Sequence, residues 1–248
     1  MDEKYTYGDV SIKSPFVTKL ENFWYHYKWH SIISAFLVIV ILICSLQMCT
    51  KTTYDVHILY AGAYKLEKTS SDGDVSPYMG TVSSLKRVSD DFDKNGSVDV
   101  NLLDLFVMTN EEISEFYQNE SNAGKEINEI QIRDNTETLD TTLLMSNYYV
   151  CFLSESLFLK YSAQHSGALF AEIAPYTNPN NNYEYASSKG IYIRSLDFYE
   201  MPYISALPDD TVVCIRRLSD VSGLFGGADA EDSFKRAEIV LREILGAK

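Results

Sequence analysis

The chain has 248 residues, of which 35 are acidic and 21 are basic, so its formal net charge is −14. A surplus of this size argues against nucleic acid as a partner and against an anionic membrane surface for the acidic part, because both would repel it. Four cysteines are too few for a disulfide scaffold, and no pair of them has the spacing of a metal site, so no cofactor is expected.

The first predicted element is a transmembrane helix over residues 31–49. This stretch contains no charged side chain. Residues 32–49 reach roughly 27 Å as a helix, close to the ~30 Å hydrocarbon thickness of a bilayer. Aromatic rings crowd just before it, which is typical of the headgroup boundary. The predicted membrane-interface residues are Trp24, Tyr25, Tyr27, Lys28 and Trp29.

This helix is interpreted as an uncleaved signal anchor. Thirty residues precede the apolar run, which is long for the n-region of a cleaved signal, and Gln47-Met48-Cys49 offers no small-x-small cleavage site. The first 49 residues carry four lysines and four acids, so the whole surplus of negative charge belongs to residues 50–248. We therefore expect a cytoplasmic tail at 1–30 and an extracytoplasmic domain at 50–248, in a single-pass protein of the cell membrane.

The outer domain alternates strand and helix patterns, which predicts an α/β fold with a mostly parallel sheet in three layers. The run at 98–108 is long and apolar enough to predict a central strand. No internal repeat is visible. The predicted strands are 54–60, 98–108, 148–153, 190–194 and 211–217, and the predicted helices are 77–92, 111–118, 136–145 and 155–164.

A last helix follows, with Asp229 and its neighbouring acids expected at its start, where the helix dipole favours negative charge. The glycine-rich stretch before it, Gly223–Gly227, predicts a flexible loop rather than a phosphate cradle, since the acids would repel a phosphate. The asparagine- and tyrosine-rich stretch 176–188 also predicts a long polar loop. Cys151 and Cys214 each lie in a predicted strand, and we expect buried thiols rather than a disulfide.

Parts of this domain resemble a known family. The segments YDVHILYAGAY, SSLKRVSDDFDKNG and VDVNLLDL, followed by TLDTTLLMSNYYVCFLSESLFLKY, resemble one lobe of type II extracytoplasmic solute-binding proteins. The segment KLENFWYHYKWHSII is similar to that of uncharacterised single-pass proteins of Gram-positive bacteria. The resemblance implies a binding function, but only one lobe is matched, so no second lobe closes over a small ligand.

An acidic stretch suggests calcium at first sight. Asp91, Asp93, Asn95 and Asp99 match the ligand positions of a calcium loop, with a glycine at the turn between them. The position that should carry a bidentate glutamate is Leu102. A polar turn between helix and strand is therefore favoured over a metal site.

A serine hydrolase is a third possibility. Ser83 and Lys86 have the S-x-x-K spacing of a nucleophile and its base in penicillin-binding enzymes. The further motifs that those enzymes need do not follow, so an exposed helix surface is favoured.

A ligand should bind where parallel strands end, because open α/β sheets leave their crevice at the carboxyl ends. The leading hypothesis is a non-catalytic binding domain, accessory to a transporter or another membrane complex. Its partners would be the lipid bilayer and another membrane or surface protein, with a small-molecule ligand uncertain; the alternative is a structural or assembly subunit. The candidate ligand-binding residues are Gly62, Tyr64, Thr109, Asn110, Ser154 and Glu155.

Overall fold

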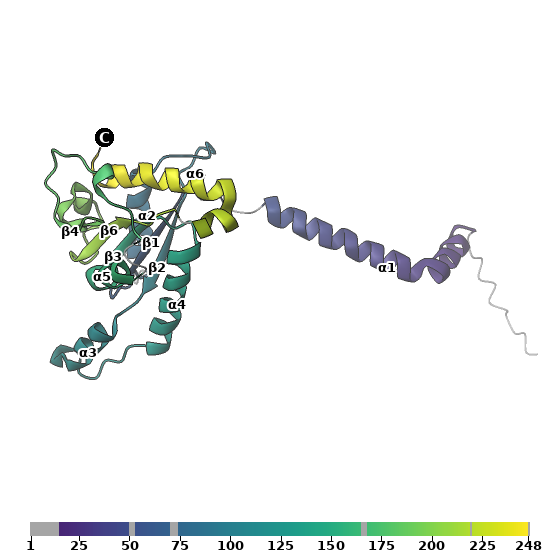
Figure 1. Ribbon diagram of the computed structural model, residues 1–248. Coiled ribbons are helices and arrows are strands. Elements are labelled where there is room, and N and C mark those ends of the chain that lie inside the picture. The colour runs from purple at the N-terminus through teal and green to yellow at the C-terminus, as the bar shows by residue number, and fades with distance from the viewer. Residues whose placement is uncertain (1–14, 50–52, 70–73, 165–167, 219, 248) are drawn as a thin grey trace, which may run out of the picture. The chain divides into compact units, whose positions relative to one another are not determined.

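The computed structural model describes residues 15–49, 53–69, 74–164, 168–218 and 220–247. The chain divides into two units, residues 1–52 and 53–248 (Figure 1). We describe each unit by itself.

The described part of the first unit is one helix, α1 (Pro15–Cys49), which is longer than the predicted 31–49. Its segment Phe23–Ser45 has a mean hydropathy of 2.0 and no buried residue, and is long and apolar enough to cross a membrane. The five predicted interface residues lie on this helix and are exposed. One apolar helix near the N-terminus is compatible with a membrane anchor or with a signal sequence.

The second unit is an α/β domain around a six-stranded sheet of order β2-β1-β3-β6-β5-β4. β1 pairs in parallel with β2 and β3, whereas β6 is antiparallel to β3 and β5, and β4 is antiparallel to β5. Four strands therefore point one way and two the other, in a mixed sheet. The strands are β1 (Val56–Gly62), β2 (Val100–Phe106), β3 (Val150–Ser154), β4 (Tyr185–Ser187), β5 (Gly190–Tyr192) and β6 (Thr211–Ile215).

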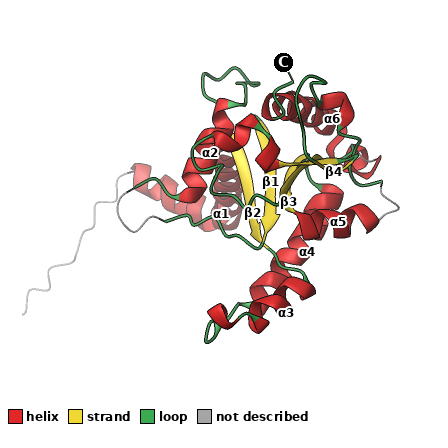
Figure 2. Cartoon of the chain, turned by 90° about the vertical axis from the view of Figure 1, so that its left-hand side faces the viewer, coloured by secondary structure: helices red, strands yellow, loops and turns green. Residues whose placement is uncertain are grey.

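Helices cover both faces of the sheet (Figure 2). Because side chains alternate along a strand, Ile58 and Tyr60 enter one core with α2 (Pro77–Arg87) and α6 (Asp220–Ile244). Leu59 and Ala61 enter the other core with α4 (Glu129–Met145) and α5 (Glu155–Ala163). The three-layer α/β prediction is thus confirmed for the described residues. The domain also contains a helix of nine residues, α3 (Asn110–Gln118). Short 3₁₀ turns lie at Glu120–Asn122, Ala174–Tyr176, Ile193–Ser195 and Asp197–Glu200.

Three predictions about elements were wrong. The strand expected to be central at 98–108 is the edge strand β2, where Asn101 and Asp104 interrupt the apolar run. Helix α6 already begins at Asp220, so the glycines at 223, 226 and 227 lie inside a helix and not in a loop. The stretch 176–188 contains β4, which pairs with β5.

The two strand cysteines are buried thiols, as predicted. Both are free and fully buried. The structure adds that Cys151 and Cys214 are direct partners across the β3–β6 ladder. The sequence could not reveal this register, because pairing depends on the sheet order.

Candidate functional site

The parallel strands bring two of the predicted binding residues together at their carboxyl ends. Gly62 ends β1 and Ser154 ends β3. A Cβ atom added at Gly62 would lie 3.4 Å from the Cβ of Ser154, an ordinary van der Waals distance, and 3.3 Å from Tyr60 Oη. The two strand ends are therefore direct neighbours.

A polar network connects the end of β3 to the segment after β2. Thr109 caps α3: its Oγ1 accepts from the Glu112 N–H at 3.2 Å, and its own N–H donates to Glu112 Oε2 at 2.6 Å. The other oxygen of Glu112 accepts from Ser156 Oγ at 2.8 Å, and Ser156 lies 3.1 Å from the Ser154 hydroxyl. Thr109 and Ser154 are therefore connected through two residues that were not predicted.

Of the two residues that were not predicted, the sequence pattern could have identified Glu112 but not Ser156. Thr109 and Glu112 form the T-x-x-E pattern of a capping box, which the sequence does carry. Ser156 has no such signal, because its partner lies 44 positions away.

Two other predicted residues do not join this network. Glu155 accepts a hydrogen bond from Tyr192 Oη at 2.5 Å, which fastens α5 to β5 and raises the pKa of Tyr192 to about 12. Tyr64 packs against the core that contains α2 and α6.

A broad hollow lies beside Thr109 and Asn110. Its volume is about 940 Å³, and it opens between α3, the first half of α4 and the start of α5. We call it the α3–α4 groove. Its walls mix apolar and charged side chains: Met108, Thr109, Asn110, Glu111, Ile113, Glu129, Ile130, Ile132, Arg133, Thr136, Ser156 and Lys160.

Charged side chains of both signs line the groove: Arg133, Lys160, Glu111 and Glu129. Arg133 lies 3.5 Å from its chain neighbour Asp134, and both are well exposed. The Lys160 ammonium lies over the ring of Tyr161, 5.3 Å from the ring centroid. The groove thus offers apolar surface together with charges of both signs.

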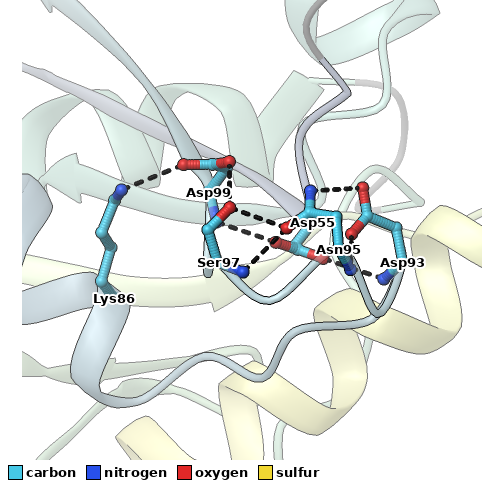
Figure 3. A network of polar contacts seen from close by, with 6 residues as sticks. All are labelled: Asp55, Lys86, Asp93, Asn95, Ser97 and Asp99. Carbon is cyan, nitrogen blue, oxygen red and sulfur yellow. Dashed lines mark hydrogen bonds and ion pairs between the residues drawn. The ribbon is translucent and has the colours of Figure 1, made fainter.

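The acidic stretch 91–99 forms a separate network at the opposite end of β1 and β2 (Figure 3). Asp55, just before β1, is almost fully buried. Its Oδ1 accepts from the N–H groups of Phe92 and Asp93, and its Oδ2 from that of Asp99. Asp91 accepts from the N–H groups of Asn95 and Gly96. The carboxylates therefore hold the turn in shape.

Only part of the predicted calcium set converges. Oxygens of Asp55, Asp91 and Asp93 lie within 4.8 Å of one another, and these three could contact a divalent cation. Asp99 is instead paired with Lys86 at 3.1 Å, and this hydrogen bond lowers the pKa of its carboxyl. One ligand oxygen from each residue gives three, whereas calcium takes six to eight oxygen ligands.

The S-x-x-K pair is not arranged as a nucleophile and its base. Ser83 is exposed on α2, while the Lys86 ammonium donates to Asp99 Oδ1. The ammonium group is thus engaged by a carboxylate and not by Ser83.

Comparison with protein-family models, with curated proteins and with solved structures finds no match for this chain.

Proposed function

We propose that this protein is a membrane-anchored, non-catalytic binding domain whose partner is another protein. α1 would span the cell membrane as a signal anchor, with the N-terminus in the cytoplasm and residues 50–248 outside. The likeness of the domain to one lobe of a solute-binding protein is part of this proposal, and the mixed α/β sheet with helices on both faces is consistent with it.

The α3–α4 groove is the observation that carries the proposal. It lies beside Thr109 and Asn110, after the carboxyl end of β2, where open α/β sheets place their ligands. Its apolar side chains and its charges of both signs suit a protein segment that carries both apolar and charged groups.

A small molecule fits this site less well. The groove is open, so a small ligand would keep much of its surface in water, whereas tight pockets bury about 70–90% of a drug-sized ligand. We expect small-molecule dissociation constants of about 0.1 mM or weaker, or roughly −5.5 kcal/mol. Calorimetry of residues 53–248, which contain both hydrophobic cores, against sugars, peptides and amino acids tests this.

The partner can be tested by photo-cross-linking in membranes of the full chain. A photoreactive residue at Ile130, which is 65% exposed on the groove, should form an identified protein adduct. The matched control is Ile239 on α6, which is 43% exposed and away from the groove. Equal labelling from both positions, or none from Ile130, would contradict the proposal and favour a structural or assembly subunit. Turnover that is lost in Ser83→Ala would instead support the hydrolase.

A further inference from the structure

Cys151 and Cys214 are the only cysteines of residues 53–248, and the fold makes them neighbours. They are register partners across β3 and β6, the antiparallel ladder that joins the parallel strands of the sheet to the antiparallel ones. Both side chains belong to the core that contains α4 and α5, and both are fully buried free thiols. Two thiols that are far apart in the chain thus lie opposite each other in the sheet.

The backbone spacing at this pair suits a disulfide. The Arg216 N–H donates to the Tyr149 carbonyl at 2.8 Å, and these two residues continue the register of the same ladder. Hydrogen-bonded and non-hydrogen-bonded pairs alternate along such a ladder, so Cys151 and Cys214 form a hydrogen-bonded pair with Cα atoms about 5.5 Å apart. Disulfides span Cα separations of about 4.4–6.8 Å, so the strands can keep their register when the bond forms.

The two thiols also contact each other. Burial, and then a hydrogen bond with Cys151, raise the pKa of the Cys214 thiol well above its usual value. The Cβ atoms of directly opposite residues lie about 4.5–5.5 Å apart, whereas those of a disulfide lie about 3.5–4.5 Å apart. The side chains must therefore approach slightly, and the resulting bond is more easily reduced than a relaxed one.

The thiols are unreactive once the domain has folded. The thiolate is the attacking form in thiol–disulfide exchange, and a raised pKa leaves the Cys214 thiol protonated at neutral pH. Side chains of α4 and α5, such as Leu143 and Phe158, share the core with both cysteines. Oxidation must therefore precede the packing of these helices on the sheet.

We propose that Cys151 and Cys214 are joined by a disulfide while the domain folds outside the cell membrane. The outward location belongs to the proposed function, on which this inference rests, and it provides oxidising surroundings. The oxidant is the disulfide of a thiol oxidoreductase or of a small molecule. One cysteine thiolate attacks this disulfide and releases one oxidant thiol, and the second cysteine then attacks the mixed disulfide and releases the other. Two electrons and two protons pass from the protein thiols to the oxidant.

The direct test uses the full chain in its membrane. Free thiols are blocked with N-ethylmaleimide in denaturant, without reductant, and the protein is digested with trypsin. Cys151 lies in the tryptic peptide 134–160 and Cys214 in the tryptic peptide 195–216. We expect mass spectrometry to find these peptides joined in most chains, lighter by two hydrogen atoms than the sum of the free peptides. Two separate, alkylated peptides would overturn the inference.

Thermal unfolding gives a second readout, on residues 53–248, which contain both hydrophobic cores. Refolding with a mixture of oxidised and reduced glutathione should give a form that melts several degrees higher than the domain refolded with dithiothreitol, because the bond restricts the unfolded chain. Cys151→Ala or Cys214→Ala should remove this difference between the two conditions. Equal melting temperatures of the unmodified domain, with both thiols still free, would contradict the inference even if neither variant folds.

The matched control is Leu153→Ala, which truncates another buried side chain of β3 and keeps both thiols. Its melting temperature should fall in both conditions, while the difference between them remains.

The two proposals fail separately. If protease reaches the domain on intact cells but the peptides are separate and alkylated, the outward location stands and the disulfide is refuted. If the peptides join only on refolding with glutathione, and protease does not reach the domain, the outward location is refuted together with the bond in the cell. Cross-linking from Ile130 tests the groove independently of the cysteines.

Discussion

The Asp104 carboxyl is a polar group whose hydrogen-bonding capacity is only partly used in the folded domain. Its Oδ1 is shielded from solvent and has no hydrogen-bond partner among the described residues. Burial raises the pKa of its carboxyl from 3.8 to about 6, against the smaller opposing effects of the Leu66 N–H and two nearby lysines. The folded state therefore holds this proton more tightly than the unfolded chain does.

The sign of the pH effect follows from this difference. The stabilising contribution of protonated Asp104 is complete below pH 3.8 and is lost as the pH rises through about 6. We predict that Asp104→Asn raises the unfolding free energy by about 1 kcal/mol at neutral pH, after allowance for solvent screening, and leaves it unchanged in acid. Urea unfolding across this pH range measures the effect. A neutral-pH loss of stability in the variant would refute the assignment.

At the acidic turn, we predict no tight calcium site. Asp91 and Asp93 accept backbone hydrogen bonds, and position 102 is a buried leucine in β2. Adding micromolar calcium to residues 53–248 should leave the melting temperature unchanged, because a ligand stabilises only the state that it binds. A rise of several degrees that Asp91→Asn abolishes would show a genuine site.

Among the elements, α3 should be the least protected helix of the domain. It has no buried residue, whereas β1, β3 and β6 are almost wholly buried. Local opening then costs much less than global unfolding. Hydrogen exchange should be fastest in α3. Thr109→Ala should speed it about fivefold, as for the loss of ~1 kcal/mol of capping. Thr109→Ala should leave the exchange rate of β3 unchanged. An equal change of the exchange rate in α3 and β3 would contradict this prediction.

The start of α6 is a boundary that the local sequence pattern did not predict correctly. The glycines at 223–227 weaken a helix locally, yet α6 runs through them from Asp220 to Ile244. Its second half packs into the core through Ala237, Val240 and Leu241, and tertiary packing of this kind outweighs propensity.

For the whole molecule, the proposed topology makes the acidic domain accessible from outside the cell. Protease added to intact cells whose wall has been removed should digest residues 50–248, while a cytoplasmic marker protein stays intact. The reason is the single apolar helix near the N-terminus, followed by a domain with its own two cores. Complete protection of the domain, with digestion only after lysis, would show the opposite orientation.

The sequence by itself determined the features that depend on local pattern. Three such features follow from hydropathy and periodicity along the chain: the uncharged run within α1, the alternation of strands and helices, and the buried strands around Cys151 and Cys214. Thr109 was also predicted at the site, because a strand end is a local feature.

Only the tertiary structure decided which distant residues become neighbours. It made Cys151 and Cys214 partners in the β3–β6 register and placed β2 at the edge of the sheet. It also brought Asp55 to the turn that begins 36 positions later in the chain. It also buried Arg216, whose guanidinium donates to the Leu143 carbonyl at the end of α4. Parallel strands are joined by long crossover connections, so their order and register depend on which hydrophobic core each helix packs into. The local sequence pattern does not contain this information.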